Sequence, residues 1–130
     1  MVERRRRTTA VVPIEKEPYA SPFVLALAVI RGPDLNAIHR ITQDETLVGR
    51  SEEAHFELSD TLISDKHFLI RVRGSLYSLY DLGSTNGTLL NGQVVSAKTP
   101  VRLKNLDEIE MGRTRILFIA ARFHTEPTNP

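Results

Sequence analysis

The fold is decided by residues 67–82, which read HFLIRVRGSLYSLYDL. Side chains in this stretch recur with period two on both sides of a Gly-Ser pair, with Phe68, Ile70 and Val72 before Gly74 and Ser75, and Leu76, Ser78 and Tyr80 after them. Such alternation predicts two half-buried strands, and the Gly-Ser pair between them predicts a tight turn. The stretch is therefore expected to form a β-hairpin.

Short strand-forming runs separated by turn signals continue along the chain. Asn91 and Gly92 lie between two apolar runs and are a strong hairpin signal, because a type I′ turn needs positive φ at both central residues. No segment offers three clean helical turns. The expected strands are residues 23–30, 38–42, 46–49, 55–58, 67–73, 76–81, 88–90, 93–95, 101–103, 108–111 and 114–121. Many short strands of this kind predict an all-β sandwich.

The composition indicates one globular domain. The chain has 130 residues, of which 41% are hydrophobic and 25% charged. Residues 1–21 combine an arginine block with several prolines and are expected to form a flexible basic tail. The folded domain is expected at residues 22–122, and residues 123–130 are interpreted as a C-terminal tail or the start of a linker.

Charge, cysteine content and hydropathy exclude several classes of protein. The formal net charge is +1, which gives no overall basic field for nucleic acid. The absence of cysteine excludes a disulfide framework and fits a cytoplasmic location. The longest apolar run, residues 23–30, is too short to span a bilayer, and its flank does not resemble a signal peptide.

Four loops carry more polar groups than turn formation requires: residues 49–51, 63–67, 83–87 and 91–92. Together they hold an arginine, a lysine, several hydroxyls, the carboxamides of Asn86 and Asn91, and backbone N–H groups next to glycines. Charge-assisted bonds from Arg or Lys, combined with neutral donors, are what a phosphate dianion needs. The loops therefore predict an anion-binding site.

The same loops do not predict catalysis. Ser64, Asp65 and His67 lie too close together in one loop to align as nucleophile, orienting group and base. The sequence has no GK[ST] P-loop, and its four histidines lack metal-ligand spacing. We expect no enzyme activity, no cofactor and no metal.

In order and spacing, these motifs resemble those of the forkhead-associated (FHA) domain, a phosphothreonine-binding β-sandwich. The matching elements are Gly49-Arg50, Ser64-x-x-His67, Ser84-Thr85-Asn86-Gly87 and Asn91-Gly92. The resemblance covers residues 23–121 and implies about eleven strands in two sheets, with peptide-binding loops at one end. FHA domains are attached to many output domains, so the resemblance also implies a regulatory module of a bacterial signalling protein, for instance an N-terminal module of a diguanylate cyclase.

The resemblance assigns roles to individual residues. Arg50 is expected to reach the phosphate or the peptide backbone, Ser64 and Thr85 to contact the phosphate, and Asn86 to bind the peptide main chain. Lys66 is a further source of positive charge. The expected supporting residues are Gly49, Asp65, His67, Ser84, Gly87, Asn91 and Gly92.

Asp65 departs from the family pattern, because this position often carries Arg or Asn. A carboxylate facing the phosphate would repel it. Either Asp65 turns outward and Lys66 or Arg50 supplies the charge, or the domain binds phosphate weakly. The second alternative favours a scaffolding domain that binds partners independently of phosphate. Each loop residue also has a structural explanation, since short polar side chains often bond their own backbone.

The tail sequence RRRRTTAVV, residues 4–12, suggests a ligand within the chain itself. The arginines make Thr8 and Thr9 candidate substrates of a basic-directed Ser/Thr kinase. Val11 and Val12 follow these threonines by three residues, where FHA domains commonly read a side chain. The phosphorylated tail is therefore expected to bind its own domain in cis or a second copy in trans. The alternative is a solvated or nucleic-acid-attracting arm, but no aromatic stacking platform accompanies the arginines.

Overall fold

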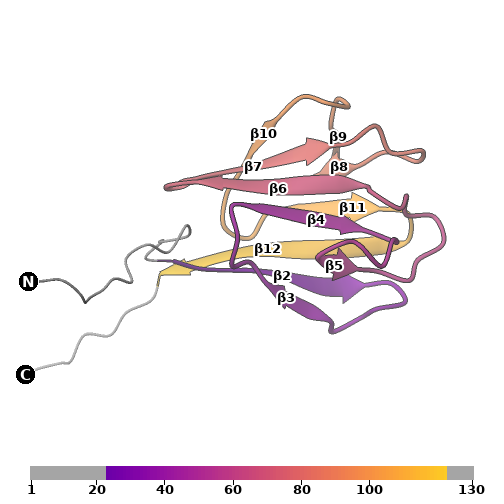
Figure 1. Ribbon diagram of the computed structural model, residues 1–130, viewed down its shortest axis with the longest axis horizontal. Helices are drawn as coiled ribbons and strands as arrows, with labels where there is room; N and C mark the ends of the chain where they lie inside the picture. Colours follow the sequence, from indigo (N-terminus) through magenta and orange to yellow (C-terminus); the bar gives the residue numbers. More distant parts are fainter. Residues whose placement is uncertain (1–22, 123–130) are drawn as a thin grey trace, which may run out of the picture.

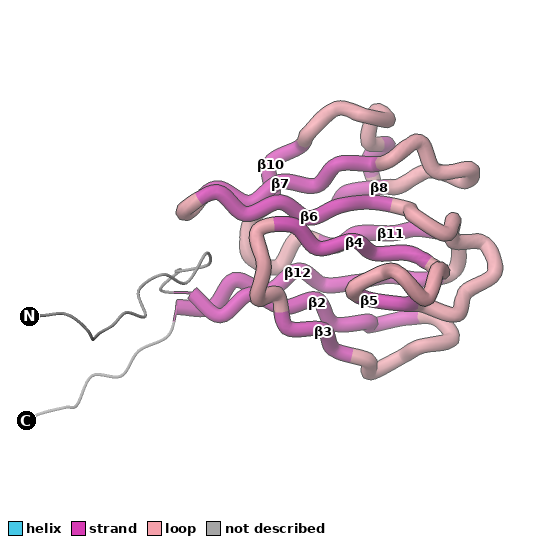
Figure 2. The backbone as a smooth tube through the Cα atoms, viewed as in Figure 1, coloured by secondary structure: helices cyan, strands magenta, loops and turns pink. Residues whose placement is uncertain are grey.

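The computed structural model describes residues 23–122, which form a sandwich of two antiparallel-rich sheets (Figures 1 and 2). No helix occurs within these residues. One sheet has five strands in the order β10-β7-β6-β4-β5, and the other has six in the order β3-β2-β12-β11-β8-β9. The strands are β2 (Phe23–Arg31), β3 (Ile38–Arg40), β4 (Glu45–Gly49), β5 (Phe56–Glu57), β6 (Phe68–Arg73), β7 (Leu76–Asp81), β8 (Leu89–Leu90), β9 (Gln93–Val94), β10 (Val101–Leu103), β11 (Glu108–Met111) and β12 (Thr114–Arg122). The predicted all-β sandwich is confirmed.

Both predicted hairpins form. Arg73 pairs with Leu76 across a two-residue turn in which Gly74 has φ of 62°. At the β8–β9 turn, Asn91 has φ of 50° and Gly92 of 83°, the conformation that a type I′ turn requires. These turns fix the register of the strands that they join.

The core lies between the two sheets and is built from alternate residues of each strand. Phe68, Ile70 and Val72 point inward from β6. On β7 the inward residues are Tyr77, Leu79 and Asp81, so Leu76, Ser78 and Tyr80 form the outer row. The largest fully buried side chains are Phe68, Phe118, Leu25, Leu27, Ile41, Leu58, Ile63, Ile70, Leu79, Leu103, Ile109 and Ile116.

Three loops meet at one end of the sandwich. β4 ends at Gly49, β6 begins at Phe68 and β7 ends at Asp81, all at the right-hand end in Figure 1, whereas β2 begins at Phe23 at the other end. Residues 49–51, 63–67 and 83–87 are therefore neighbours in space. Within residues 23–122 there is no helix long and apolar enough to cross a membrane, and no cluster of three or more side chains arranged to hold a metal ion.

Candidate functional site

Gly49 joins the first loop to the second by close backbone contact. A Cβ at this position would lie 2.0 Å from the carbonyl oxygen of Asp65 and 3.0 Å from that of Ser64. The same approach allows Arg50 N to donate to Ser64 O at 3.0 Å and Ser51 N to donate to Asp65 O at 3.2 Å. Only glycine leaves room for these two bonds, so Gly49 fixes the loop of residues 63–67 against the end of β4.

His67 joins the second loop to the third. Its side chain is fully buried, and its Nδ1 accepts a hydrogen bond from Ser64 N at 3.0 Å. Because Nδ1 accepts, the proton is on Nε2, which donates to Gly87 O at 3.0 Å. Burial lowers the pKa of His67, although the bond to Gly87 and the carboxylates of Asp81 and Asp60 oppose the shift. A neutral imidazole therefore bridges the two loops.

Asp81 organises the third loop from within, and sequence reasoning missed this role. One carboxylate oxygen accepts bonds from Gly83 N and Ser84 N, both at 2.8 Å, and the other accepts from the hydroxyls of Ser84 and Thr88. Burial alone would raise the pKa of Asp81, but the bonds from Thr88, Ser84 and Gly83 outweigh it and lower the pKa. The signal was present in the sequence, because an Asp two residues before a glycine often caps its own turn.

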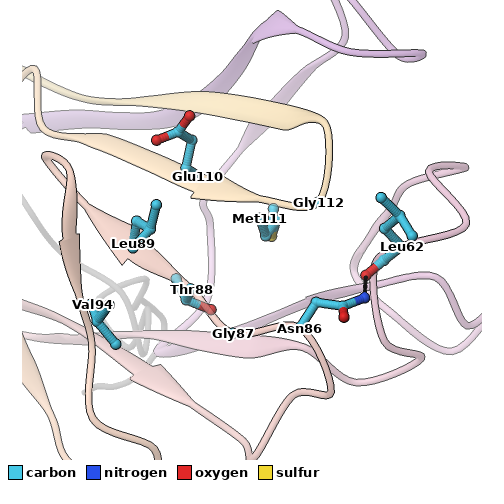
Figure 3. A pocket seen from close by; sticks show the side chains of 9 residues that line it. All are labelled: Leu62, Asn86, Gly87, Thr88, Leu89, Val94, Glu110, Met111 and Gly112. Carbon is cyan, nitrogen blue, oxygen red and sulfur yellow. Dashed lines mark hydrogen bonds between the residues drawn. The ribbon is translucent and has the colours of Figure 1, made fainter.

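Ser64 and Asn86 connect the loops through their side chains. Thr85 N donates to Ser64 Oγ at 3.0 Å, so this hydroxyl accepts from the protein and keeps its own proton for another acceptor. Asn86 Nδ2 donates to Leu62 O at 2.9 Å, and its side chain lies at the rim of the site (Figure 3). The predicted binding residues Ser64, Thr85 and Asn86 are thus brought together.

The charged residues divide into two pairs. Arg50 Nε donates to Ile63 O at 3.0 Å, and Arg50 Nη2 lies 4.0 Å from Asp65 Oδ1. The Asp65 side chain is 73% exposed, so its carboxylate is solvated beside Arg50. Lys66 lies 4.0 Å from Glu53. Of the two cations, Arg50 is the one held next to Ser64 by a bond to the backbone.

Asn91 and Gly92 lie outside this cluster. Asn91 Nδ2 donates to Asp107 Oδ1 at 3.0 Å, and Asn91 Oδ1 accepts from Glu108 N at 2.9 Å. The turn is therefore braced against the start of β11. Within the described residues, neither Asn91 nor Gly92 makes a hydrogen bond or ion pair to the three loops.

A pocket of about 390 Å³ opens beside Asn86 (Figure 3). Its walls are mostly apolar, and its charged residue, Glu110, is bonded to Arg115 at 2.8 Å. The lining residues are Leu62, Asn86, Gly87, Thr88, Leu89, Val94, Glu110, Met111 and Gly112. The sequence did not reveal this pocket, because its walls come from loops and strands far apart in the chain.

Buried Asp60 positions the pocket wall. Its carboxylate accepts bonds from Leu62 N at 2.9 Å, Arg113 N at 2.7 Å and the Thr114 hydroxyl at 2.8 Å. Burial would raise the pKa of Asp60, but these bonds and the Arg113 charge lower it. Asp60 thereby holds Leu62 against the β11–β12 turn.

The site thus has the chemistry of a binding surface: a fixed cation, a hydroxyl with a free proton, an exposed carboxamide and an adjoining apolar pocket. A sandwich that carries such loops at one end defines a class of peptide-binding or anion-binding domains. The family model of the FHA domain matches residues 46–112, and the chain belongs to this family.

Similar proteins are found among bacterial regulators and solved structures. The chain is 33% identical over 93 residues to the oxoglutarate dehydrogenase inhibitor of Corynebacterium jeikeium, covering 72% of this chain and 62% of that protein. It is 32% identical over 110 residues to the glycogen accumulation regulator GarA of Mycolicibacterium smegmatis, covering 85% and 66%. The chain therefore spans about two thirds of the length of these relatives. A structure from a study of phosphothreonine-dependent FHA domain interactions matches with a TM-score of 0.67 and 30% identity, covering 79% of this chain and 99% of that one.

Proposed function

We propose that this protein is a binding module for phosphothreonine peptides, without catalytic activity of its own. The observation that carries the proposal is the convergence of Arg50, Ser64 and Thr85 at one point, where the three loops are hydrogen-bonded to one another. The phosphothreonine-dependent interactions studied for a structural relative support the same ligand class.

The charged side chains of the site are suited to bind a phosphothreonine, whose phosphate carries a negative charge of about −1.5 to −2. The Ser64 hydroxyl donates its free proton to a phosphate oxygen, and the Arg50 guanidinium donates through nitrogens that its bond to Ile63 leaves available. The ion pair between Arg50 and Asp65 is long and exposed, so the phosphate displaces it at little cost. Lys66 adds a solvated positive charge nearby.

The peptide around the phosphothreonine meets Asn86 and the apolar pocket. The Asn86 carboxamide retains its oxygen and one N–H, which pair with a peptide main chain. The pocket next to it accepts an aliphatic side chain further along the peptide, because Leu62, Val94 and Met111 contribute to its walls. Glu110 in the same wall disfavours an acidic side chain there.

The tail of the chain is the ligand that this chemistry favours. Thr8 and Thr9 lie outside the described residues, and each is followed after three residues by a valine of the size that the pocket accepts. An extended chain from Thr9 to Phe23 reaches about 45 Å, longer than the roughly 30 Å of a nine-residue strand such as β2. Binding in cis and in trans are both sterically open. A Ser/Thr kinase supplies the phosphate, and the absence of cysteine supports a cytoplasmic setting for this signalling.

The test is calorimetric titration of the chain with a peptide of residues 4–14, unphosphorylated and phosphorylated at Thr8 or at Thr9. We expect binding of a phosphorylated form only. Arg50→Ala, Ser64→Ala and Asn86→Ala should each weaken it about tenfold or more, because a charge-assisted hydrogen bond contributes about 1.5–3 kcal/mol. Lys104→Ala, an exposed cation in the loop after β10, serves as the control and should bind normally. Unchanged affinity in the Arg50 and Asn86 variants would reject the assigned site.

A phosphate-independent scaffold is the second candidate, and the carboxylate of Asp65 beside Arg50 favours it. Asp65→Asn separates the two functions. If phosphate displaces the Asp65 carboxylate, the variant binds the phosphopeptide more tightly than the wild type, and the unphosphorylated peptide stays unbound. Equal binding of both peptides by both proteins would favour the scaffold. A parallel titration with duplex DNA at two salt concentrations tests the basic arm, whose binding should fall steeply with salt.

A further inference from the structure

Two adjacent strands of the six-stranded sheet, β2 and β12, are largely apolar on both faces. β2 buries Leu25, Leu27 and Val29 in the core. Its alternate residues point away from the core and are also apolar: Val24, Ala26, Ala28 and Ile30. β12 repeats the pattern after Arg115, which pairs with Glu110: Leu117, Ile119 and Ala121 alternate with its core residues.

These residues form one continuous surface. Ala28 is in register with Leu117 on β12 and with Ile38 on β3, and Ala26 is in register with Ile119 and with Arg40. We call the patch of Val24, Ala26, Ala28, Ile30, Ile38, Leu117, Ile119 and Ala121 the outer sheet face. Ile38 is 69% exposed and Ile30 is 40% exposed. On β2 the middle of the patch consists of the small residues Ala26 and Ala28, which lie beside Ile119 and Leu117 of β12.

An antiparallel sheet that faces water normally alternates apolar and polar residues. Strands that are apolar on both faces are typical of sheets covered on both sides. Within residues 23–122 no element covers the outer sheet face, since both sheets place their cores on the other side. Apolar patches of this extent mark interaction sites.

The charges at the edges of the face indicate what covers it. On the β3 side, Arg40 is exposed and has no ion pair within the described residues. On the β11 side, Glu108 is in register with Leu117. Only one of its carboxylate oxygens, Oε1, forms an ion pair, at 3.5 Å from Arg115 Nη1. One edge therefore offers a free cation and the other a carboxylate with an oxygen to spare, with the apolar strip between them.

We propose that the outer sheet face is a homodimer interface formed with a second copy of this chain. A two-fold axis between two facing sheets, parallel to the strands, places β3 of one copy opposite β11 of the other. The apolar strips then stack, and Arg40 of each copy lies on the same edge as Glu108 of its mate, two residues away along the strands because Arg40 is level with Ile119 and Glu108 with Leu117. The long Arg40 and Glu108 side chains span this offset, and the pairing occurs twice by symmetry.

The size of the face fits a weak dimer. β2 and β12 have nine residues each, β11 has four and β3 has three, so together they cover about 400 Å² of flat sheet. This is about half of the roughly 800 Å² per partner of a standard interface, which places the contact among weak, transient ones. β8 and β9, which carry Leu89 and Val94 of the peptide pocket, lie beyond β11 and outside the overlap, whereas Glu110 and Met111 of the same pocket belong to β11. The interface therefore borders the apolar pocket, and the loops of residues 49–51, 63–67 and 83–87 lie outside it at the end of the sandwich (Figure 1).

The first test measures the mass of the unphosphorylated 130-residue chain by sedimentation equilibrium from about 1 μM to 1 mM. We expect a rise from 14.6 kDa toward twice that value. Ile38→Asp should weaken self-association at least about tenfold, because it places a charge in the strip. Leu76→Asp is the matched control: Leu76 is 52% exposed on the outer row of the other sheet and should leave association unchanged. A monomer at 1 mM, or equal effects of the two variants, would overturn the proposal.

Charge reversal tests the orientation. Arg40→Glu and Glu108→Arg should each weaken association, since each places like charges opposite one another twice. The double variant restores both pairs and should recover most of the wild-type association. Failure of the double variant to recover any association would overturn the two-fold arrangement. The double variant Arg50→Ala/Ser64→Ala changes only the peptide site and should not alter the mass. The dimer proposal and the proposed function are therefore tested independently of each other.

Discussion

At the scale of single residues, the contacts between the loops of the site depend on Gly49, which has no side chain, and on His67, whose two ring nitrogens bond to different loops. Gly49 leaves space for the backbone of residues 64 and 65, and His67 accepts from one loop while donating to another. Both residues affect ligand binding without contacting the ligand. Both hold Ser64 where its hydroxyl proton is available, so substitutions at either position should act on binding through geometry.

Gly49→Ala should reduce both stability and phosphopeptide affinity. Gly49 does not have positive φ, so the cost is steric: a Cβ would lie 2.0 Å from Asp65 O and must displace the loop. Overpacking of this kind costs about 1–3 kcal/mol. Gly74→Ala is the control, since its φ of 62° also disfavours alanine but nothing lies within 4 Å of the added atom. Urea denaturation should show both variants destabilised, whereas titration should show lost affinity only for Gly49→Ala. Normal binding by Gly49→Ala would mean that the loop does not depend on this contact.

The stability of the domain should fall as the pH is lowered below about 6.5, partly through His67. Burial keeps the folded-state pKa of His67 below its ordinary value of 6.5, so the unfolded chain binds more protons in this range. The contribution is present above pH 6.5 and is lost as the pH falls through the folded pKa. Protonation of Nδ1 also breaks the bond from Ser64 N.

Urea denaturation at pH 7.5 and 5.0 without peptide measures this effect. His67→Gln should have a smaller drop in unfolding free energy between the two values than the wild type. His39→Gln is a necessary comparison, because burial, with a smaller contribution from His55, also lowers the pKa of His39. The lowered pKa values of Asp60 and Asp81 act only below about pH 3.8, outside this interval. An equal drop in wild type and His67→Gln would assign the pH dependence elsewhere.

At the scale of strands and loops, local patterns were predictable and long-range ones were not. The turns at Gly74 and at Asn91 and Gly92 follow from residues that tolerate positive φ, and the sequence located both. By contrast, the role of Asp60 depends on Arg113 and Thr114, 53 and 54 residues away. Period-two alternation on β7 did not by itself tell which row, Leu76 or Tyr77, faces the core. Pairing with β6 decides that, and pairing is a tertiary property.

The apolar pocket yields a prediction about specificity. Leu62→Arg should shift the preference at the third residue after the phosphothreonine from valine toward aspartate, because it places a cation in the wall where Leu62 is 39% exposed. The change should reverse the ranking of two phosphopeptides that differ only at that residue, measured by fluorescence polarisation. Arg73→Leu, a substitution in the β6–β7 hairpin, should leave the ranking unchanged. An unaltered ranking in Leu62→Arg would show that this side chain does not enter the pocket.

At the scale of the whole molecule, the phosphopeptide loops and the outer sheet face lie on different sides of the sandwich. The phosphopeptide loops lie at one end of the sandwich, and β2, whose first residue is Phe23, starts at the other end (Figure 1). The outer sheet face lies along the side of the six-stranded sheet. One chain can therefore pair with a second copy through its sheet while its loops hold a phosphorylated segment. In such a dimer, the tail of one copy has two sites within reach, its own and that of its mate.

Phosphorylation of Thr8 or Thr9 should fill the loop site and exclude other phosphopeptides. Tethering gives the tail an effective concentration near about 1 mM, so for a site with a Kd of about 10 μM an external phosphopeptide should bind about 100-fold more weakly. The measurement compares the phosphorylated chain with Thr8→Ala/Thr9→Ala treated with the same kinase. NMR shifts at Ser64 and Asn86 should appear only in the first protein. The Ile38→Asp background removes the sheet dimer, so a mass that still rises with concentration indicates tail exchange in trans and a constant mass indicates binding in cis. If phosphorylation neither shifts these resonances nor weakens the external peptide, the domain binds a threonine on another protein.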